Sequence, residues 1–356
     1  MRIILAFLIV SVLYTGAALA QNVYIANQGS NTVSVISGDP TVTIDVGMGP
    51  SALAVTPDGD FVYVANSGSD TVSVIQTSNN TVVDTVDVGP TPFGVAVTPN
   101  GDFVYIANAG SDTVSVIQTS NNTVVATVDV GQDPTGIAIP NDTSVFVANT
   151  ASDTVSVIQI SDNTVIHTIN VGLSPIGIAA GANGDSIYVA NSASNTVSVM
   201  CVEDPTCPLV TIDVGEDPID IATSTNSTLN LDLVYVTNQT SNTITIINHP
   251  FNEIEATLDV ADSPTGIAAT PNGDFIYVTH FNSSMAGEIQ FGTTSWSDES
   301  LFPTGNEPTS VAIAPSEGLG DPDPDPDPMG QSSGRKNSCS LAAPGAAPSF
   351  LPLIHI

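Results

Sequence analysis

Short runs of Val, Ile and Thr, interspersed with Ser or Ala and separated by turn residues, follow one another along most of the chain. No stretch shows the three-to-four-residue apolar spacing of a helix. In one representative stretch, four such runs are joined by tight turns rich in Asp, Asn, Gly and Ser: Pro50–Pro57, Phe61–Asn66, Thr71–Gln76 and Thr81–Gly89. This pattern predicts a four-stranded antiparallel meander. Because the runs are apolar on both pleat faces, the sheet should be packed on both sides.

The second of these runs recurs seven times with nearly the same letters, VYVAN. Its copies are Val23–Asn27, Val62–Asn66, Val104–Asn108, Val145–Asn149, Ile187–Asn191, Val234–Asn238 and Ile276–His280. Repetition at about 42 residues without helical pattern is typical of a β-propeller. A stack of hairpins or a β-solenoid is the alternative, but this repeat is about twice the length of a solenoid coil.

The two ends of the repeat region are complementary. The first copy begins directly at Val23 and lacks the preceding strand, whereas Pro308–Ala314 supplies that strand with nothing after it. The innermost strands then begin at seven prolines: Pro50, Pro92, Pro134, Pro175, Pro218, Pro264 and Pro308. The sequence therefore predicts an all-β, seven-bladed β-propeller of four-stranded antiparallel blades over residues 21–316. Its C-terminal strand completes the N-terminal blade and closes the ring, which removes exposed sheet edges.

The repeated unit, PxGVAVTPNGDFVYVAN followed by DTVSVIQ and NTVVATVDVG, resembles the YVTN repeat, whose name matches the letters at Tyr235–Asn238. The resemblance extends over residues 22–315. It implies a secreted or surface β-propeller, similar in architecture to propeller lactonases and to propeller subunits of quinoprotein dehydrogenases. Fold alone does not choose among these activities.

The N-terminal end of the chain predicts an exported protein. Residues 1–20 contain Arg2, an apolar run and an Ala18-Leu19-Ala20 cleavage site, as in a signal peptide. An uncleaved membrane anchor is the alternative.

Residues 317–330 contain a stiff acidic Asp-Pro spacer. Residues 331–356 form a tail that we expect to be disordered, either without a role or as a truncated sorting signal attached to the surface through Cys339. We expect the protein in the periplasm, on the cell surface or outside the cell.

Charge limits the choice of partners. The formal net charge is −33, and no Lys or Arg lies between Arg2 and Arg335. Such a field should repel nucleic acid, phosphorylated substrates and acidic membranes. Solubility is the favoured explanation of the acidic surface, and the alternative is that it binds a divalent cation such as Ca²⁺, which prefers oxygen ligands. No EF-hand or RTX pattern is present, and we expect a monomer.

Two cysteines lie close together in the sequence. Cys201 and Cys207 flank a hairpin turn, and in an exported protein they are expected to form a disulfide. Zinc is disfavoured, because no further Cys or His lies near them in sequence.

The search for catalytic motifs is mostly negative. The sequence has no CxxCH, no phosphate-binding glycine loop and no G-x-S-x-G elbow. His167, His249 and His355 lack a sequence partner, and His280 replaces the Asn that ends the other six VYVAN copies. That repeated Asn is expected to be structural, because Asn bonds the backbone of a following turn.

Variable loops that enter the innermost strands should surround one mouth of the central channel. Their acids are the candidate binding rim: Asp133, Glu216, Asp217, Asp262 and Glu307. The last blade departs most from the repeat and carries an unusual set of apolar residues: Phe281, Met285, Phe291, Trp296 and Phe302. Core packing is the favoured interpretation of this set, with ligand contact as the alternative.

Three functions follow from these features. The first is a non-catalytic exported scaffold whose variable loops bind a protein, a glycan or a cation. The alternative is a propeller lactonase-like hydrolase or lyase with a metal at the channel mouth. The third is a periplasmic subunit of a redox complex, for which the sequence shows neither a cofactor motif nor a docking surface.

Overall fold

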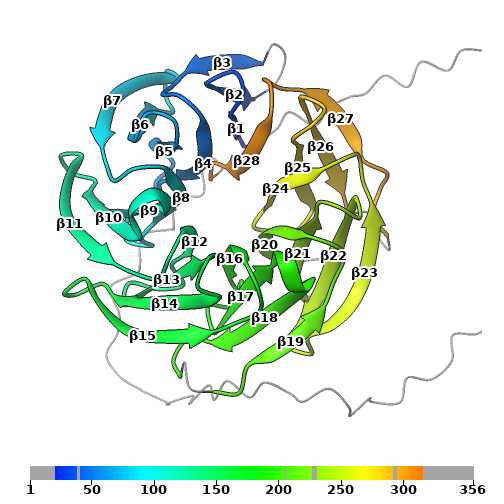
Figure 1. Cartoon of the computed structure of the whole chain (residues 1–356). Helices are drawn as coiled ribbons and strands as arrows, with labels where there is room; N and C mark the ends of the chain where they lie inside the picture. Colours follow the sequence, from blue (N-terminus) through cyan, green and yellow to red (C-terminus); the bar gives the residue numbers. More distant parts are fainter. Residues whose placement is uncertain (1–20, 38–40, 205–206, 227–230, 292–294, 316–356) are drawn as a thin grey trace, which may run out of the picture.

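The computed structural model describes residues 21–315, apart from 38–40, 205–206, 227–230 and 292–294. Seven four-stranded antiparallel sheets are arranged around a central channel (Figure 1). The predicted fold class, an all-β seven-bladed propeller, is confirmed. The predicted signal peptide, the spacer and the tail with Cys339 lie outside the described residues. Within the described part of the chain, no helix has the length and apolar character needed to cross a membrane.

Each blade runs from an innermost strand at the channel to an outermost strand at the rim. Blade 1 consists of β28 (Pro308–Ile313), β1 (Val23–Asn27), β2 (Thr32–Ile36) and β3 (Val42–Asp45). Blade 2 consists of β4 (Pro50–Val55), β5 (Phe61–Asn66), β6 (Thr71–Gln76) and β7 (Thr81–Asp87). Blade 3 consists of β8 (Pro92–Val97), β9 (Phe103–Asn108), β10 (Thr113–Gln118) and β11 (Thr123–Asp129). Blade 4 consists of β12 (Pro134–Ala138), β13 (Ser144–Asn149), β14 (Thr154–Gln159) and β15 (Thr164–Asn170).

The remaining three blades follow the same order. Blade 5 consists of β16 (Pro175–Ala180), β17 (Ser186–Asn191), β18 (Thr196–Cys201) and β19 (Val210–Asp213). Blade 6 consists of β20 (Pro218–Asn226), β21 (Leu231–Asn238), β22 (Thr243–His249) and β23 (Glu253–Asp259). Blade 7 consists of β24 (Pro264–Ala269), β25 (Phe275–His280), β26 (Met285–Gln290) and β27 (Ser300–Pro303). Two short 3-10 turns, Ala109–Ser111 and Ser192–Ser194, follow β9 and β17.

Ring closure occurs as predicted. Strand β28 pairs antiparallel with β1, with Tyr24 opposite Ala312 and Ile25 opposite Val311 (Figure 1). The first blade therefore contains strands from both ends of the described region. The innermost edge of β1 is thereby paired, so it is not open to pairing with another chain.

Apolar residues of the two middle strands of each blade form the core between blades. Every residue of β1, from Val23 to Asn27, is buried, and the same is true of Val62–Asn66 in β5. Side chains of neighbouring blades pack together, as Tyr63 does with Val104 and Ile106. Both sheet faces are covered, which explains why these strands are apolar on both faces.

The repeated Asn has a structural role, as predicted, but its partners are mainly hydroxyl groups of the third strand and not the backbone of the turn. In blade 2, Asn66 Nδ2 donates hydrogen bonds to Thr71 Oγ1 at 3.2 Å and to Ser73 Oγ at 3.0 Å. The side chain lies against Gly47, where an added Cβ would come within 2.6 Å of Asn66. Equivalent bonds occur at five other repeated Asn residues: Asn27, Asn108, Asn149, Asn191 and Asn238. The shared Asn thus fastens the turn between the second and third strands.

Candidate active site in the central channel

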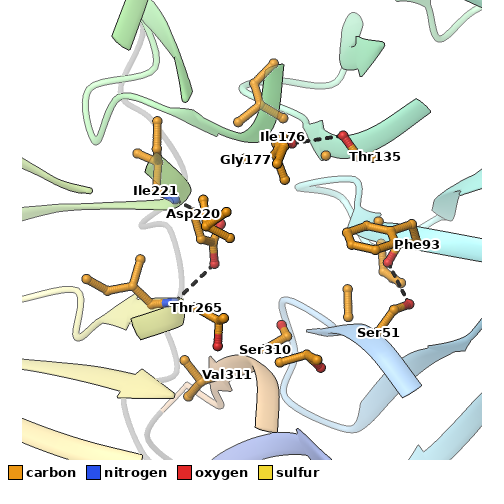
Figure 2. Close-up of a pocket in the computed structure, with 18 of the residues that line it drawn as sticks. Ser51, Phe93, Thr135, Ile176, Gly177, Asp220, Ile221, Thr265, Ser310 and Val311 are labelled. Carbon is orange, nitrogen blue, oxygen red and sulfur yellow. Dashed lines mark hydrogen bonds between the residues drawn. The ribbon is translucent and has the colours of Figure 1, made fainter. Parts of the chain in front are cut away.

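A pocket of about 390 Å³ lies in the central channel, and all seven innermost strands contribute to its wall (Figure 2). Each innermost strand begins with Pro, so corresponding residues can be compared around the ring. The third residue of these strands, counting the Pro as the first, differs between blades: Ala52, Gly94, Gly136, Gly177, Asp220, Gly266 and Ser310. Asp220 is the one carboxylate among the residues that line the pocket.

The glycines at this ring position are required by close approach between neighbouring strands. A Cβ added at Gly94 would lie 2.0 Å from the carbonyl oxygen of Thr135, and one at Gly136 would lie 2.4 Å from that of Ile176. Such contacts are impossible without moving the backbone. A side chain as large as Asp220 is therefore exceptional at this position.

Asp220 is held in place from both of its neighbouring strands. Its Oδ2 accepts a hydrogen bond from the backbone N–H of Ile267 in β24 at 3.1 Å, and Oδ1 accepts one from the N–H of Ile221 at 2.9 Å. The N–H of Asp220 donates to Thr237 Oγ1 at 3.1 Å, and that hydroxyl donates to the carbonyl of Thr265 at 2.7 Å. The carboxylate therefore has a fixed position on the channel wall.

Burial alters the acidity of this carboxyl group. Protein atoms surround Asp220 while part of its surface faces the pocket, and this desolvation raises its pKa to about 6. The two backbone N–H donors lower the pKa, but they offset only part of the effect. A carboxyl group with a pKa near neutrality is suited to proton transfer.

The rest of the wall combines apolar groups with hydroxyl and amide groups. Figure 2 shows Phe93 on the side of the pocket opposite Asp220. Phe281, Gln28 and Gln239 also line the pocket. The hydroxyl groups mostly join neighbouring blades: Ser51 Oγ, for example, donates to the carbonyl of Pro92 at 2.9 Å.

The five acids predicted as a binding rim do not converge on this pocket, and none of them lines it. Asp133, Asp217 and Glu307 occupy the same place in the repeat, with positive φ angles of 54°, 57° and 52°. Their backbone groups fasten the turns, as when the N–H of Asp133 donates to Asp112 Oδ1 at 2.9 Å. Glu216 and Asp262 are exposed. The binding role of these acids stays a prediction.

The channel mouth does not present a set of metal ligands. Among the described residues, no three His, Cys, Asp or Glu side chains gather where they could hold a metal ion. Asp220 stands alone among ring positions otherwise occupied by Gly, Ala and Ser. The residues present therefore do not fit the metal at the channel mouth that the lactonase-like alternative included.

Several residues of blade 7 differ together from their counterparts in the other blades, and His280 is one of them. Its Nε2 and Glu299 Oε1 are 2.5 Å apart, and both side chains are buried. In the other blades the repeated Asn bonds a Thr and a Ser, or two Thr residues in blade 6. The corresponding residues of blade 7 are Met285 and Gly287. A Cβ at Gly287 would lie 1.8 Å from Glu299, so the glycine makes room for the carboxylate. The other Glu299 oxygen accepts a hydrogen bond from the N–H of Ala261 at 2.8 Å.

His249 also has partners that the sequence did not reveal. Its Nδ1 lies 2.5 Å from the hydroxyl of Tyr188 in blade 5, and its Nε2 lies 2.9 Å from Asn183 Nδ2. Asp185 Oδ1 lies 3.4 Å from the same Nε2. This cluster joins blades 5 and 6 and contributes no residue to the central pocket. We interpret it as an inter-blade contact.

The two hairpin cysteines lie close together. The backbone N–H of Cys201 donates to Cys207 Sγ at 3.2 Å. No disulfide joins these two described residues in this structure, so the expected bridge stays a prediction.

The unusual apolar residues of blade 7 divide between core and pocket. Trp296 packs edge to face against Tyr235 and Phe291, with ring centroids 5.6 and 4.8 Å apart. Phe302 packs against the core between blades 7 and 1. Phe281, by contrast, lines the central pocket. Core packing thus accounts for Trp296, Phe291 and Phe302. Met285 is half-buried and does not line the pocket, and ligand contact remains open for Phe281.

Comparison with known proteins supports the fold and shows a similarity in sequence to one family. The family model for lactonases of the seven-bladed β-propeller type matches residues 30–130 and 94–169, which span strands of blades 1 to 4. Comparison with curated proteins gives no match. The chain is thus a seven-bladed β-propeller that is similar in sequence to propeller lactonases.

Solved structures share the architecture at low sequence identity. A candidate 6-phosphogluconolactonase from Bacteroides uniformis is 18% identical with a TM-score of 0.67, covering 82% of this chain and 99% of that one. Another from Bacteroides fragilis is 14% identical with a TM-score of 0.67, covering 83% and 99%. Hydrazine synthase from Kuenenia stuttgartiensis is 18% identical with a TM-score of 0.67, covering 76% and 92%. At these identities the structural likeness shows the fold.

The comparisons correct the first functional prediction. A non-catalytic binding scaffold was expected because repeated motifs dominate the sequence and no catalytic motif is present. The lactonase family match favours the alternative, a propeller lactonase-like hydrolase or lyase. The prediction of a non-catalytic scaffold is therefore wrong.

Proposed function

We propose that the protein is a lactonase-like hydrolase that opens a cyclic ester in the central pocket. The observation that carries this proposal is the single carboxylate, Asp220, on the wall of a pocket built by all seven innermost strands. Its raised pKa, about 6, leaves it deprotonated at neutral pH and still basic enough to accept a proton. The match to the lactonase family supports the reaction class.

In this reaction Asp220 acts as the general base. It accepts a proton from a water molecule while the water oxygen forms a bond to the lactone carbonyl carbon. The ring C–O bond then breaks, and Asp220 returns the proton to the leaving alkoxide, which yields a hydroxy acid. Gln28 and Gln239 also line the pocket, and their side-chain amides are the candidate donors to the carbonyl oxygen as negative charge develops there.

The test is hydrolysis of a panel of γ- and δ-lactones, followed as acid release at constant pH. We expect the wild-type protein to open at least one lactone, and Asp220→Asn to lower kcat/KM by about 10²- to 10⁴-fold. Asp87→Asn, which changes an exposed acid in the outermost strand β7 away from the pocket, serves as the matched control and should leave the rate unchanged. Equal rates for wild type and Asp220→Asn would refute the assignment.

We also propose that the enzyme is an exported propeller of the YVTN-repeat type. The recurring VYVAN letters and the apolar run before Ala20 support this assignment. The test is N-terminal sequencing of the protein made in a bacterial host with an export pathway. Export predicts a mature chain that begins at Gln21, and a chain that retains Met1 in the cytoplasm would contradict it.

A further inference from the structure

We propose that the central pocket selects uncharged lactones that carry a hydrocarbon substituent and rejects lactones that carry a carboxylate or a phosphate. This inference rests on the proposed function, because it names the substrate class of the same site. It departs from the phosphorylated substrate in the names of the two similar Bacteroides proteins.

The first argument is the charge of the wall. Asp220 is the one ionisable side chain that lines the pocket, and no Lys or Arg is present from residue 21 to residue 315. An anionic substituent would therefore find no cation to pair with. It would instead meet the Asp220 carboxylate in a desolvated space, where charges of like sign repel more strongly than in water. The formal net charge of −33 adds to this repulsion at longer range.

The second argument is the apolar part of the pocket wall. Phe93, Phe281, Ile176 and Ile219 line the pocket, and Phe93 lies opposite the carboxylate (Figure 2). A hydrocarbon group placed against these side chains would gain hydrophobic contact while the ester faced Asp220. A volume of about 390 Å³ accommodates a small ring with such a substituent.

The third argument concerns the product. Opening an uncharged lactone creates a carboxylate in the pocket, and that carboxylate has the same charge as deprotonated Asp220. Repulsion then favours product release, whereas an anionic substrate would meet the same repulsion on entry. One arrangement of charge thus explains both substrate choice and product departure.

The experiment compares two pairs of compounds. Hydrolysis is measured for an alkyl-substituted lactone and for the same lactone with a terminal carboxylate on the alkyl chain. Binding is measured by calorimetry for the two corresponding lactams, which resist opening. We expect the uncharged lactone to have a kcat/KM at least about 100-fold higher than the carboxylated lactone, and its lactam to bind more tightly than the carboxylated lactam. Addition of 1 M NaCl should reduce both differences.

A charge variant provides the control. Ile176→Lys places a cation on the pocket wall and should improve use of the carboxylated lactone, whereas Ile176→Met, which is uncharged, should not. Equal use or binding of the charged and uncharged compounds would overturn the inference. Charge discrimination between the lactams without hydrolysis of either lactone would support the selectivity and refute the proposed catalysis, so the two failures are distinguishable.

Discussion

Asp220 Oδ2 accepts a hydrogen bond from the backbone N–H of Ile267 at 3.1 Å, so one carboxylate joins the innermost strands of blades 6 and 7. At the same ring position blade 5 has Gly177, where an added Cβ would lie 2.7 Å from the Cα of Asp220, so this glycine leaves room for it. Blade 6 thus differs from the other blades by having an acid at this ring position, and this acid lies on the wall of the channel. Several consequences of this arrangement can be measured.

The first prediction concerns stability against pH. The pKa of Asp220 is raised from 3.8 to about 6 in the folded protein, so the folded state binds this proton more tightly than the unfolded chain. Below pH 3.8 the group is protonated in both states and costs nothing. As pH rises from about 4 to 6, the unfolded chain releases its proton first. Titration of this one group then lowers the free energy of unfolding of the wild type by on the order of 2 kcal/mol.

Asp220→Asn removes this titration. The difference in melting temperature between this variant and the wild type should therefore shift in favour of the variant from pH 4 to pH 6.5 and then stay level. Thermal melts across this range measure it. A difference that is independent of pH, or that shifts the other way, would show that Asp220 has an ordinary or a lowered pKa.

The second prediction concerns the ring of small residues. Gly94→Ala places a methyl group 2.0 Å from the carbonyl oxygen of Thr135, so strands β8 and β12 must separate. We expect a loss of about 1–3 kcal/mol in the free energy of unfolding, typical of overpacking. Ser310→Ala is the matched control, because this blade already accommodates a Cβ at the corresponding position. Equal stability of the two variants in urea titrations would contradict the account.

The third prediction concerns the buried pair in blade 7. His280→Asn restores the residue of the other blades but leaves Glu299 buried without its His partner. The new Asn also lacks hydroxyl partners, because blade 7 has Met285 and Gly287 at the corresponding positions. We expect destabilisation of about 3–5 kcal/mol, as for other broken buried pairs. His167→Asn, at an exposed position in β15, should change stability by less than about 0.5 kcal/mol. A fully stable His280→Asn protein would show that the pair is dispensable.

The fourth prediction concerns ring closure. A chain that ends at Pro315 keeps β28, whereas a chain that ends at Gly305 lacks it and exposes the edge of β1. We expect the shorter chain to lose the cooperative melt and to aggregate. Circular dichroism and light scattering compare the two truncated proteins directly. A monomeric, cooperatively melting shorter chain would mean that β28 does not hold the ring.

The fold could be predicted from the sequence because it depends on local, repeated signals. The VYVAN strands, their turns and the unpaired strand at Pro308 determine the number of blades and how the ring closes. The structural role of Asn66 and its counterparts was also predictable, since a residue shared by nearly all blades meets a need that those blades share.

The candidate site was not predicted, because Asp220 belongs neither to a variable loop nor to a motif that the blades share. Asp220 lies inside a strand, where PxGxA becomes Pro-Ile-Asp-Ile-Ala, and Thr237 replaces the Ala of VYVAN in the same blade. Both changes are visible in the sequence and could have identified the site. The pairs His249–Tyr188 and His280–Glu299 could not be found in this way, because their contacts depend on how blades and turns come together in space.

The most direct test of the central claim is the pH dependence of kcat/KM for the best lactone substrate, measured for the wild type and for Asp220→Asn. If Asp220 is the general base, the wild-type rate rises with pH, passes an inflection at about 6 and then stays level, because only the deprotonated carboxylate accepts a proton. The variant should be slower and show no such inflection. A variant with the wild-type rate and the same inflection would contradict the account.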